Sequence, residues 1–361
     1  MRPIFTLLGV VAIHMLGFGI VIPVMPYVVK ELGGGSEAYG VLVSIFSAVQ
    51  MVSAPLWGAL SDRIGRGPVI TLGLALAAIG SAMAYGARSL AELALARAVS
   101  GMGGGTLGAV QALIADLSPP ERRASNMALF GVAFGIGFIL GPVVGGLLSV
   151  WGVRTPFIAA VIFSAAAAAL STSLPRVRGR VGFSISLQFG AVAGLVLALN
   201  LAFSMFESML VYYAADVFKM APSDLGVLML IIGLAVASAQ PAVRRLEGRV
   251  TYATSALAGF VATGAGIGVL PALGELGLYL GSAVAAVGQM VASSSLFALF
   301  SQGERGRGIG FGALQSTASL GRIIGPSLAG WIYLKLGPSY VFYAAALLLL
   351  AASLAFWFWR R

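Results

Sequence analysis

The chain has 361 residues, of which 59% are hydrophobic and only 9% are charged, and its mean hydropathy is +0.98. This composition excludes a soluble globular domain and indicates an integral membrane protein. The lack of cysteine and the presence of a single histidine exclude disulfides, thiolate chemistry and a cysteine or histidine metal cluster within the chain, so we expect no metal and no cofactor.

Apolar blocks of about 20 residues recur along the chain, each long enough to cross a hydrocarbon core of roughly 30 Å as a helix. The short alternating strands of a transmembrane barrel are not seen. The first block lacks a small-residue cleavage site and is expected to be retained. We therefore predict an all-α membrane protein with twelve transmembrane helices. The predicted spans are residues 4–26, 38–60, 68–87, 91–115, 125–149, 153–173, 187–214, 224–243, 252–272, 275–299, 309–331 and 337–358.

Basic residues predict the orientation, because short loops rich in Lys and Arg stay on the cytoplasmic side. Of the 22 Lys and Arg residues, fifteen fall on the side of the amino terminus and five on the other side, and Arg97 and Arg322 lie within spans. We expect both termini in the cytoplasm and the chain in the cell (inner or plasma) membrane. The net charge of +10 follows from this asymmetry and matches anionic lipid, so nucleic-acid binding is not needed to explain it.

Three motifs recur in one order at an offset of 183 or 184 residues. The pairs are "GPVVGG" at 141–146 with "GPSLAG" at 325–330, "PPERRA" at 119–124 with "QGERGR" at 302–307, and "DRIGR" at 62–66 with "RRLEGR" at 244–249. The repeat predicts two six-helix bundles, residues 1–174 and 187–361, joined by a cytoplasmic linker over 175–186. Because both halves start inside, the repeat is parallel, and a substrate path is expected between the halves.

His14 falls near the midplane of the first span, and under an offset of 186 residues its counterpart in the second half is Asn200. This placement favours a polar cavity, in which the histidine either titrates or stays neutral with a hydrogen bond between helices. Arg97 lies near the outer end of the fourth span, where its side chain either joins a polar network or extends to the surface.

The loop "GALSDRIGR" places an acid and two arginines between two long apolar spans. Arg66 can reach Asp116 at the inner end of the fourth span, so the loop is expected to form a latch across the cytoplasmic face in one conformational state. Exposed salt bridges contribute only about 0 to 1 kcal/mol each, so the latch must act as a network or in partial burial. The predicted latch residues are Gly58, Asp62, Arg63, Gly65, Arg66 and Asp116.

Glycine-proline pairs in the fifth and eleventh spans predict helix kinks, because proline removes a helix hydrogen bond. Arg322, just before the second pair, is expected to bind exposed backbone carbonyls. The neighbouring glycines also allow helices to approach closely, whatever the function. The predicted residues of these kinks are Gly141, Pro142, Gly145, Gly146, Arg322, Gly325 and Pro326.

Glu207, in "NLAFSMFESMLVYY", is the only acid in the interior of a predicted span, because the other acids within the span bounds are the first or second residue of their span. A charge at membrane depth costs at least about 2.5 kcal/mol, so such a residue usually faces a cavity or a partner. Burial disfavours the ionised form, which suits a proton carrier. Glu207 therefore either binds a proton or a cationic substrate, with His14 and Arg97 as further coupling residues, or makes a structural hydrogen bond near the outer interface.

Glutamines on several spans either form interhelical hydrogen bonds or line an apolar, adaptable pocket with aromatic residues and methionines. Such a pocket suits bulky lipophilic substrates better than sugars or phosphates. The predicted cavity residues are His14, Phe18, Gln50, Gln111, Asn200, Met205, Phe206, Met209, Tyr212, Gln240, Gln289 and Gln315.

Over nearly its whole length the chain resembles the major facilitator superfamily. "GALSDRIGR" is similar to the superfamily's loop between helices 2 and 3, and "RAVSGMGGGTLGA" to its helix 4 motif. "GFILGPVVGG" resembles the helix 5 motif of drug:proton antiporters, and "GFGIVIPVMPYV" the twelve-helix tetracycline and multidrug efflux branch. Two departures disfavour tetracycline itself as the substrate: His14 stands where those exporters have an acid, and "AAIGSAMAY" in the third span has none.

The resemblance implies a secondary active transporter rather than an enzyme. We expect a monomer that exports lipophilic, drug-like molecules by proton antiport and alternating access, with substrate, protons and membrane lipids as its partners. The alternatives are a transporter of lipids, peptides or sugars, and a facilitator without proton coupling. A membrane enzyme or sensor is disfavoured, because neither a catalytic cluster nor a soluble output domain is apparent.

Overall fold

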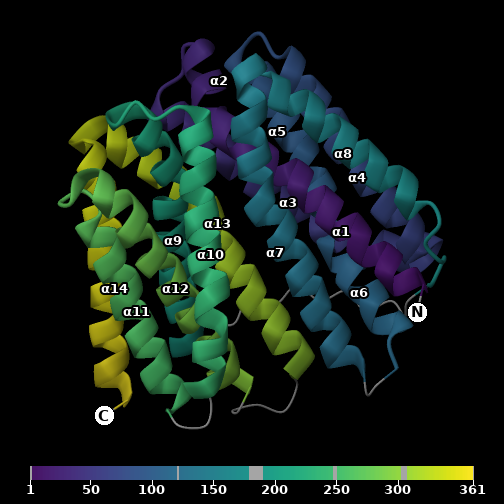
Figure 1. Cartoon of the computed structure of the whole chain (residues 1–361). Coiled ribbons are helices and arrows are strands. Elements are labelled where there is room, and N and C mark those ends of the chain that lie inside the picture. The colour runs from purple at the N-terminus through teal and green to yellow at the C-terminus, as the bar shows by residue number, and fades with distance from the viewer. Residues whose placement is uncertain (1, 120–121, 179–189, 247–249, 302–306, 361) are drawn as a thin grey trace. The chain divides into compact units, whose positions relative to one another are not determined.

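The computed structural model describes residues 2–119, 122–178, 190–246, 250–301 and 307–360, and every element in these ranges is a helix (Figure 1). Ten helical segments in them are long and apolar enough to cross a membrane. The shorter apolar helix α8 (Thr155–Ser171) is not one of the ten. Each predicted span overlaps helical residues, which confirms the all-helical membrane fold, whereas twelve crossings and cytoplasmic termini stay predictions.

The chain divides into two compact units, which we describe separately. Unit 1 comprises Met1–Gly34, Ile45–Phe183 and Met220–Val227, and unit 2 comprises Gly35–Ser44, Ser184–Lys219 and Leu228–Arg361. Two helices, α3 (Ser36–Ile64) and α10 (Pro222–Leu246), contribute residues to both units.

The other helices of unit 1 follow the first half of the sequence. They are α1 (Arg2–Val21), η1 (Ile22–Val24), α2 (Met25–Glu31), α4 (Arg66–Gly86), α5 (Leu90–Gly104), α6 (Leu107–Leu117), α7 (Arg123–Leu148), η3 (Ser149–Trp151) and α8.

Glycines allow α1 and α7 to pack backbone against backbone. On α7, Gly137, Gly141 and Gly145 recur every four residues and so share one face. A Cβ at Gly137 or Gly145 would overlap a carbonyl oxygen of α1, and a Cβ at Gly141 would lie 2.7 Å from Gly19 Cα. Small residues therefore determine the helix spacing, as is common in membrane bundles.

Two predicted spans of unit 1 are not single regular helices. The first is interrupted at η1, where Pro23 and Pro26 disturb the helical hydrogen bonds, and continues to Glu31. The fourth, predicted over 91–115, divides into α5 and α6 after a run of glycines. There Thr106 Oγ1 donates to Gly103 O at 2.8 Å. Glycine and threonine favour local turns over helix, so this span consists of two helices. The segment Leu90–Leu117 is still long and apolar enough to cross a membrane, as predicted.

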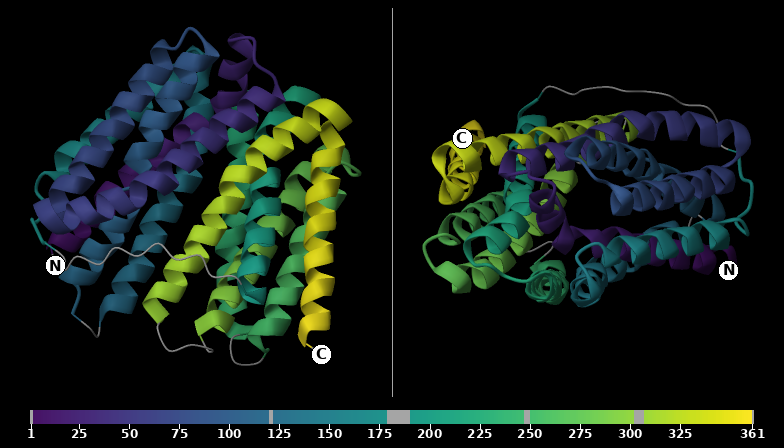
Figure 2. Two further views of the ribbon diagram at one scale, coloured as in Figure 1. Left: turned by 180° about the vertical axis from the view of Figure 1, so that it is seen from behind. Right: turned by 90° about the horizontal axis from the view of Figure 1, so that it is seen from above.

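Unit 2 is built around α9 (Ala191–Val217), which is buried on most sides against α13 (Arg307–Leu336), α14 (Pro338–Arg360) and α12 (Gly274–Ser301). Helix α14, yellow in Figure 2, also packs against α11 (Tyr252–Val269). Glycines again permit the closest approaches: a Cβ at Gly321 on α13 would lie 2.6 Å from Leu201 N on α9.

The first turns of α3 also bind α13 inside unit 2. Ser44 Oγ donates to Ile323 O at 2.6 Å and accepts from Ser327 N at 3.1 Å, and Ser36 Oγ donates to Gly330 O at 3.2 Å. A Cβ at Gly40 would overlap the carbonyl of Pro326. This end of α3 is therefore held by serine hydroxyls and by a contact that only glycine permits.

Candidate functional site

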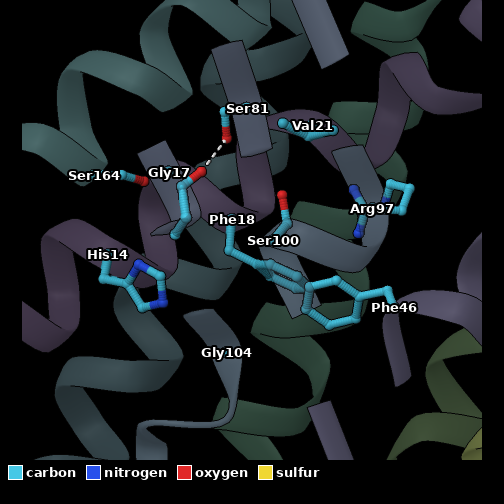
Figure 3. A pocket seen from close by; sticks show the side chains of 11 residues that line it. His14, Gly17, Phe18, Val21, Phe46, Ser81, Arg97, Ser100, Gly104 and Ser164 are labelled. Carbon is cyan, nitrogen blue, oxygen red and sulfur yellow. Dashed lines mark hydrogen bonds between the residues drawn. The ribbon is translucent and has the colours of Figure 1, made fainter. Parts of the chain in front are cut away.

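A polar cavity of about 40 Å³ lies inside unit 1 (Figure 3). One face of α1 supplies His14, Gly17, Phe18 and Val21, which are three, four and seven residues apart and therefore adjacent on the helix. The remaining lining residues come from α3, α4, α5 and α8. They are Phe46, Ala77, Ser81, Arg97, Ser100, Gly104 and Ser164.

Aromatic rings form the apolar wall of this cavity. The ring centroids of Phe18 and Phe46 are 5.4 Å apart, and that of Phe138 on α7 lies 6.3 Å from Phe18. The guanidinium carbon of Arg97 lies 4.8 Å from the centroid of the Phe46 ring, a cation–π contact. The charge of Arg97 is thus positioned at the junction between the polar and apolar walls (Figure 3).

His14 is the most unusual member of the lining. Its Nδ1 atom is buried and has no hydrogen-bond partner among the described residues. A buried polar atom without a partner costs about 1 to 3 kcal/mol, so such atoms are rare in folded proteins. The structure therefore places His14, Phe18 and Arg97 at one cavity, whereas their roles in transport stay predictions.

Gln50 has a structural contact beside the cavity. Its Nε2 atom donates to Gly104 O at 3.2 Å, and a Cβ at Gly104 would lie 2.9 Å from that nitrogen. This bond links α3 to α5. Of the two interpretations offered for the glutamines, interhelical hydrogen bonds or a pocket lining, it matches the first.

Three of the predicted latch residues, Asp62, Arg66 and Asp116, form a charged cluster where the junction of α3 and α4 meets the end of α6. Arg66 Nε donates to Asp116 Oδ2, and Arg66 Nη2 lies 3.6 Å from Asp62 Oδ1. Gly65 has φ +103, a left-handed backbone conformation that favours glycine. Arg63 is exposed, and a Cβ at Gly58 would have no neighbour within 4 Å.

The same loop docks on the segment that follows α8. Arg66 N donates to Val177 O at 2.9 Å. A Cβ at Gly67 would lie 2.9 Å from the carbonyl oxygens of both Leu174 and Pro175. All these contacts lie within unit 1, so the observed cluster connects the loop to α6 and to the chain after α8.

In unit 2, Glu207 of α9 and Arg322 of α13 lie close enough for their charges to interact. Both side chains are exposed, although α9 is otherwise largely buried around Glu207. Arg322 Nη2 also donates to Ser319 Oγ at 3.1 Å, so its observed partners differ from the backbone carbonyls that we expected. Gly325 and Pro326 follow within α13, where a Cβ at Gly325 would overlap Ser204 Oγ.

A second acid of α9 lies in an aromatic cluster. Tyr333 Oη donates to Asp216 Oδ2 at 2.7 Å, and the Tyr333 and Tyr212 rings meet edge to face at 5.3 Å. Tyr39 lies 5.4 Å from Tyr212. Asp216 was missed because the predicted span ended at residue 214, whereas α9 continues to Val217.

The other predicted cavity residues are distributed over both units. Met205, Phe206 and Met209 are buried in unit 2, and Asn200 Nδ2 donates to Val196 O of its own helix. Gln111 and Gln240 are exposed, Gln289 Oε1 is buried without a partner among the described residues, and the Gln315 side chain lies outside the described parts. In unit 1, Gly146 packs against Pro222, and Pro142 lies inside α7 without ending it.

No group of three or more acidic or histidine side chains is placed to hold a metal ion in the ranges that the structure describes.

The described residues form helices, many of which are long and apolar enough to cross a membrane, and this architecture is that of a polytopic membrane protein. The chain belongs to the Major Facilitator Superfamily, whose sequence profile matches residues 7–185 and 191–361. It is a multi-pass protein of the plasma membrane, and the recognition of this family from the sequence motifs is confirmed.

Two kinds of drug resistance protein are among its relatives. The quinolone resistance protein NorA of Staphylococcus aureus is 30% identical over 243 residues, which cover 63% of this chain and 62% of NorA. The class C tetracycline resistance protein of Escherichia coli is 36% identical over 164 residues, 45% of this chain and 41% of that protein. The chain thus matches less than two thirds of these relatives' lengths.

A solved structure shows the same fold. The nucleoside transporter NupG superimposes with a TM-score of 0.81, at 15% sequence identity and with 98% of each chain covered. At this identity the likeness concerns the fold alone.

Proposed function

We propose that the protein is a secondary active exporter of lipophilic, drug-like molecules, driven by proton antiport and working by alternating access. The observation that carries this proposal is the similarity to quinolone and tetracycline resistance proteins, at 30% and 36% identity. The aromatic wall of Phe18, Phe46 and Phe138 supports it, because apolar and aromatic surfaces bind lipophilic molecules with few specific contacts.

Proton coupling is assigned to Glu207. A carboxylate inside a membrane-spanning helix requires a compensating partner, and Arg322 supplies one. Proton binding neutralises Glu207 and removes its attraction to Arg322, so protonation changes the contact between α9 and α13. A proton that binds one conformation better than another shifts the balance between conformations, which is the requirement for coupled transport.

The charged cluster around Arg66 has a separate role in this scheme. It contacts α6 and the chain after α8 but does not need to contact substrate. We assign it to the relative stability of one transport state, with both termini and this loop on the cytoplasmic side.

The proposal is tested with Glu207→Gln in proteoliposomes that carry an imposed pH gradient. The variant keeps the shape of the side chain but cannot exchange a proton, so we expect it to lose gradient-driven transport of a fluorescent lipophilic probe. Its unfolding midpoint is expected to stay near that of the wild type.

The matched control is Glu275→Gln, which makes the same change at an exposed position in the first turn of α12. This control should keep gradient-driven transport. Transport by Glu207→Gln that responds to the gradient as the wild type does would overturn the assignment of the proton site.

A further inference from the structure

The cavity in unit 1 is lined by hydrogen-bond donors and a cation. Its polar lining residues are His14, Ser81, Arg97, Ser100 and Ser164. None of the eleven lining residues is an acid. Arg97 is the one arginine or lysine among these eleven residues, and it brings a positive charge to the cavity wall because arginine is charged at any physiological pH.

One donor or acceptor in this cavity still needs a ligand. His14 Nδ1 is buried, lies on the cavity wall and has no partner in the described chain. Ser81 already uses its proton, because its Oγ donates to Ala77 O at 2.9 Å. A ligand that bonds His14 would remove the cost of leaving that nitrogen unsatisfied.

The size of the cavity limits what it can hold. A volume of about 40 Å³ accommodates a few water molecules or one small polar group, but not a whole drug-sized molecule. The Phe18 and Phe46 rings adjoin it, so a small polar group bound here can be continuous with an apolar body against the rings (Figure 3).

We propose that this cavity is an anion subsite that binds the carboxylate of amphiphilic substrates. Arg97 donates to the carboxylate, and so does His14 from Nδ1, in the tautomer that carries its proton on that nitrogen. Phe18 and Phe46 contact the adjoining apolar part. Arginine suits this role because its planar guanidinium bonds carboxylates with two donors at once. The inference rests on the proposed export function and specifies its substrates as lipophilic organic acids and zwitterions.

The test compares lipophilic acids with their neutral derivatives on the purified full-length protein at neutral pH. Two pairs serve as probes: naphthalene-1-acetic acid with its primary amide, and a quinolone carboxylic acid with its ethyl ester. For the wild type we expect each acid to bind about tenfold more tightly than its neutral partner, the gain typical of a charge-assisted hydrogen bond.

Variants then show which residues cause the tighter binding of the acids. Arg97→Gln should reduce the ratio of the two dissociation constants to about one, and Arg97→Lys should keep part of the preference because it keeps the charge. Arg88→Gln, which removes an exposed arginine outside the cavity, should leave the ratio unchanged. His14→Leu should weaken binding of the acids more than binding of the neutral partners.

Equal binding of acid and neutral partner by the wild type would overturn the anion subsite, whether or not the variants fold. The same preference in a folded Arg97→Gln would also overturn it. If acid and neutral partner bind equally and both are exported against a gradient, the anion subsite falls and the proposed function stands. If neither member of any pair binds or is transported, both fall.

Discussion

His14 illustrates how a single residue can oppose stability. Its Nδ1 atom is buried without a partner, on a helix where an apolar side chain would pack well. A residue that breaks the local rule for buried polar groups is expected at a functional site, where stability is exchanged for activity.

We therefore predict that His14→Leu raises the free energy of unfolding by about 1 kcal/mol, because it removes an unsatisfied polar group. The same variant should transport the probe more slowly. Denaturant unfolding in detergent and uptake into vesicles measure the two effects. A loss of stability would show instead that His14 is a structural residue.

Arg66 and Asp116 allow a test of the charged cluster. The Arg66 side chain is 13% exposed and that of Asp116 is 33% exposed, so the pair is partly protected from solvent. A double-mutant cycle of Arg66→Ala and Asp116→Ala should give a coupling energy of about 1 kcal/mol, at the upper end for surface pairs. A coupling energy indistinguishable from zero would contradict a cooperative cluster.

At the scale of helices, glycine spacing explains how α1 and α7 approach. A Cβ at Gly145 would overlap the carbonyl of Ile20, which is backbone and cannot rotate away. Gly135, on the same helix, has nothing within 4 Å of its Cβ position. Replacing these two glycines of α7 by alanine is therefore expected to change the free energy of unfolding in opposite directions.

We predict that Gly145→Ala lowers the free energy of unfolding by about 1 to 3 kcal/mol, through overpacking. Gly135→Ala should leave the free energy of unfolding unchanged or raise it by up to about 1 kcal/mol, because alanine has a higher helix propensity than glycine. Unfolding midpoints in one detergent measure both. Equal midpoints for the two variants would mean that α1 and α7 do not pack as described.

Much of this helical architecture is predictable from the sequence, because a run of apolar residues long enough to span a bilayer has few alternatives to a helix. The ends are harder to predict, since helices such as α9 continue beyond their most apolar part. The break between α5 and α6 follows a run of glycines, where the Thr106 hydroxyl donates to Gly103 O. A hydropathy pattern does not reveal such a local turn.

The candidate site is predictable only in part. His14 and Arg97 stand out because polar residues are rare within spans. Ser81, Ser100 and Ser164 do not, because serine is common in membrane helices and only the packing of α4, α5 and α8 brings these hydroxyls to one cavity. Asp216 was not predicted as a site residue, because the predicted span ended at residue 214 and α9 continues to Val217.

At the scale of the whole molecule, the distribution of basic residues predicts which loops face the cytoplasm. The absence of cysteine makes the natural chain a ready background for single-cysteine labelling. Cysteines at Lys30 and Lys335 should react with a membrane-impermeant maleimide in intact cells. Cysteines at Arg63 and Arg178 should react only after lysis, and the reverse pattern would invert the predicted orientation.

The central claim, that substrate and protons move in opposite directions through this protein, has a direct test. Purified protein is reconstituted with a pH-sensitive dye inside the vesicles, and a lipophilic substrate gradient is imposed without a pH gradient. We predict proton movement against the direction of substrate flow in the wild type and none in Glu207→Gln. Substrate flow through the wild type without any proton movement would contradict antiport and identify a facilitator.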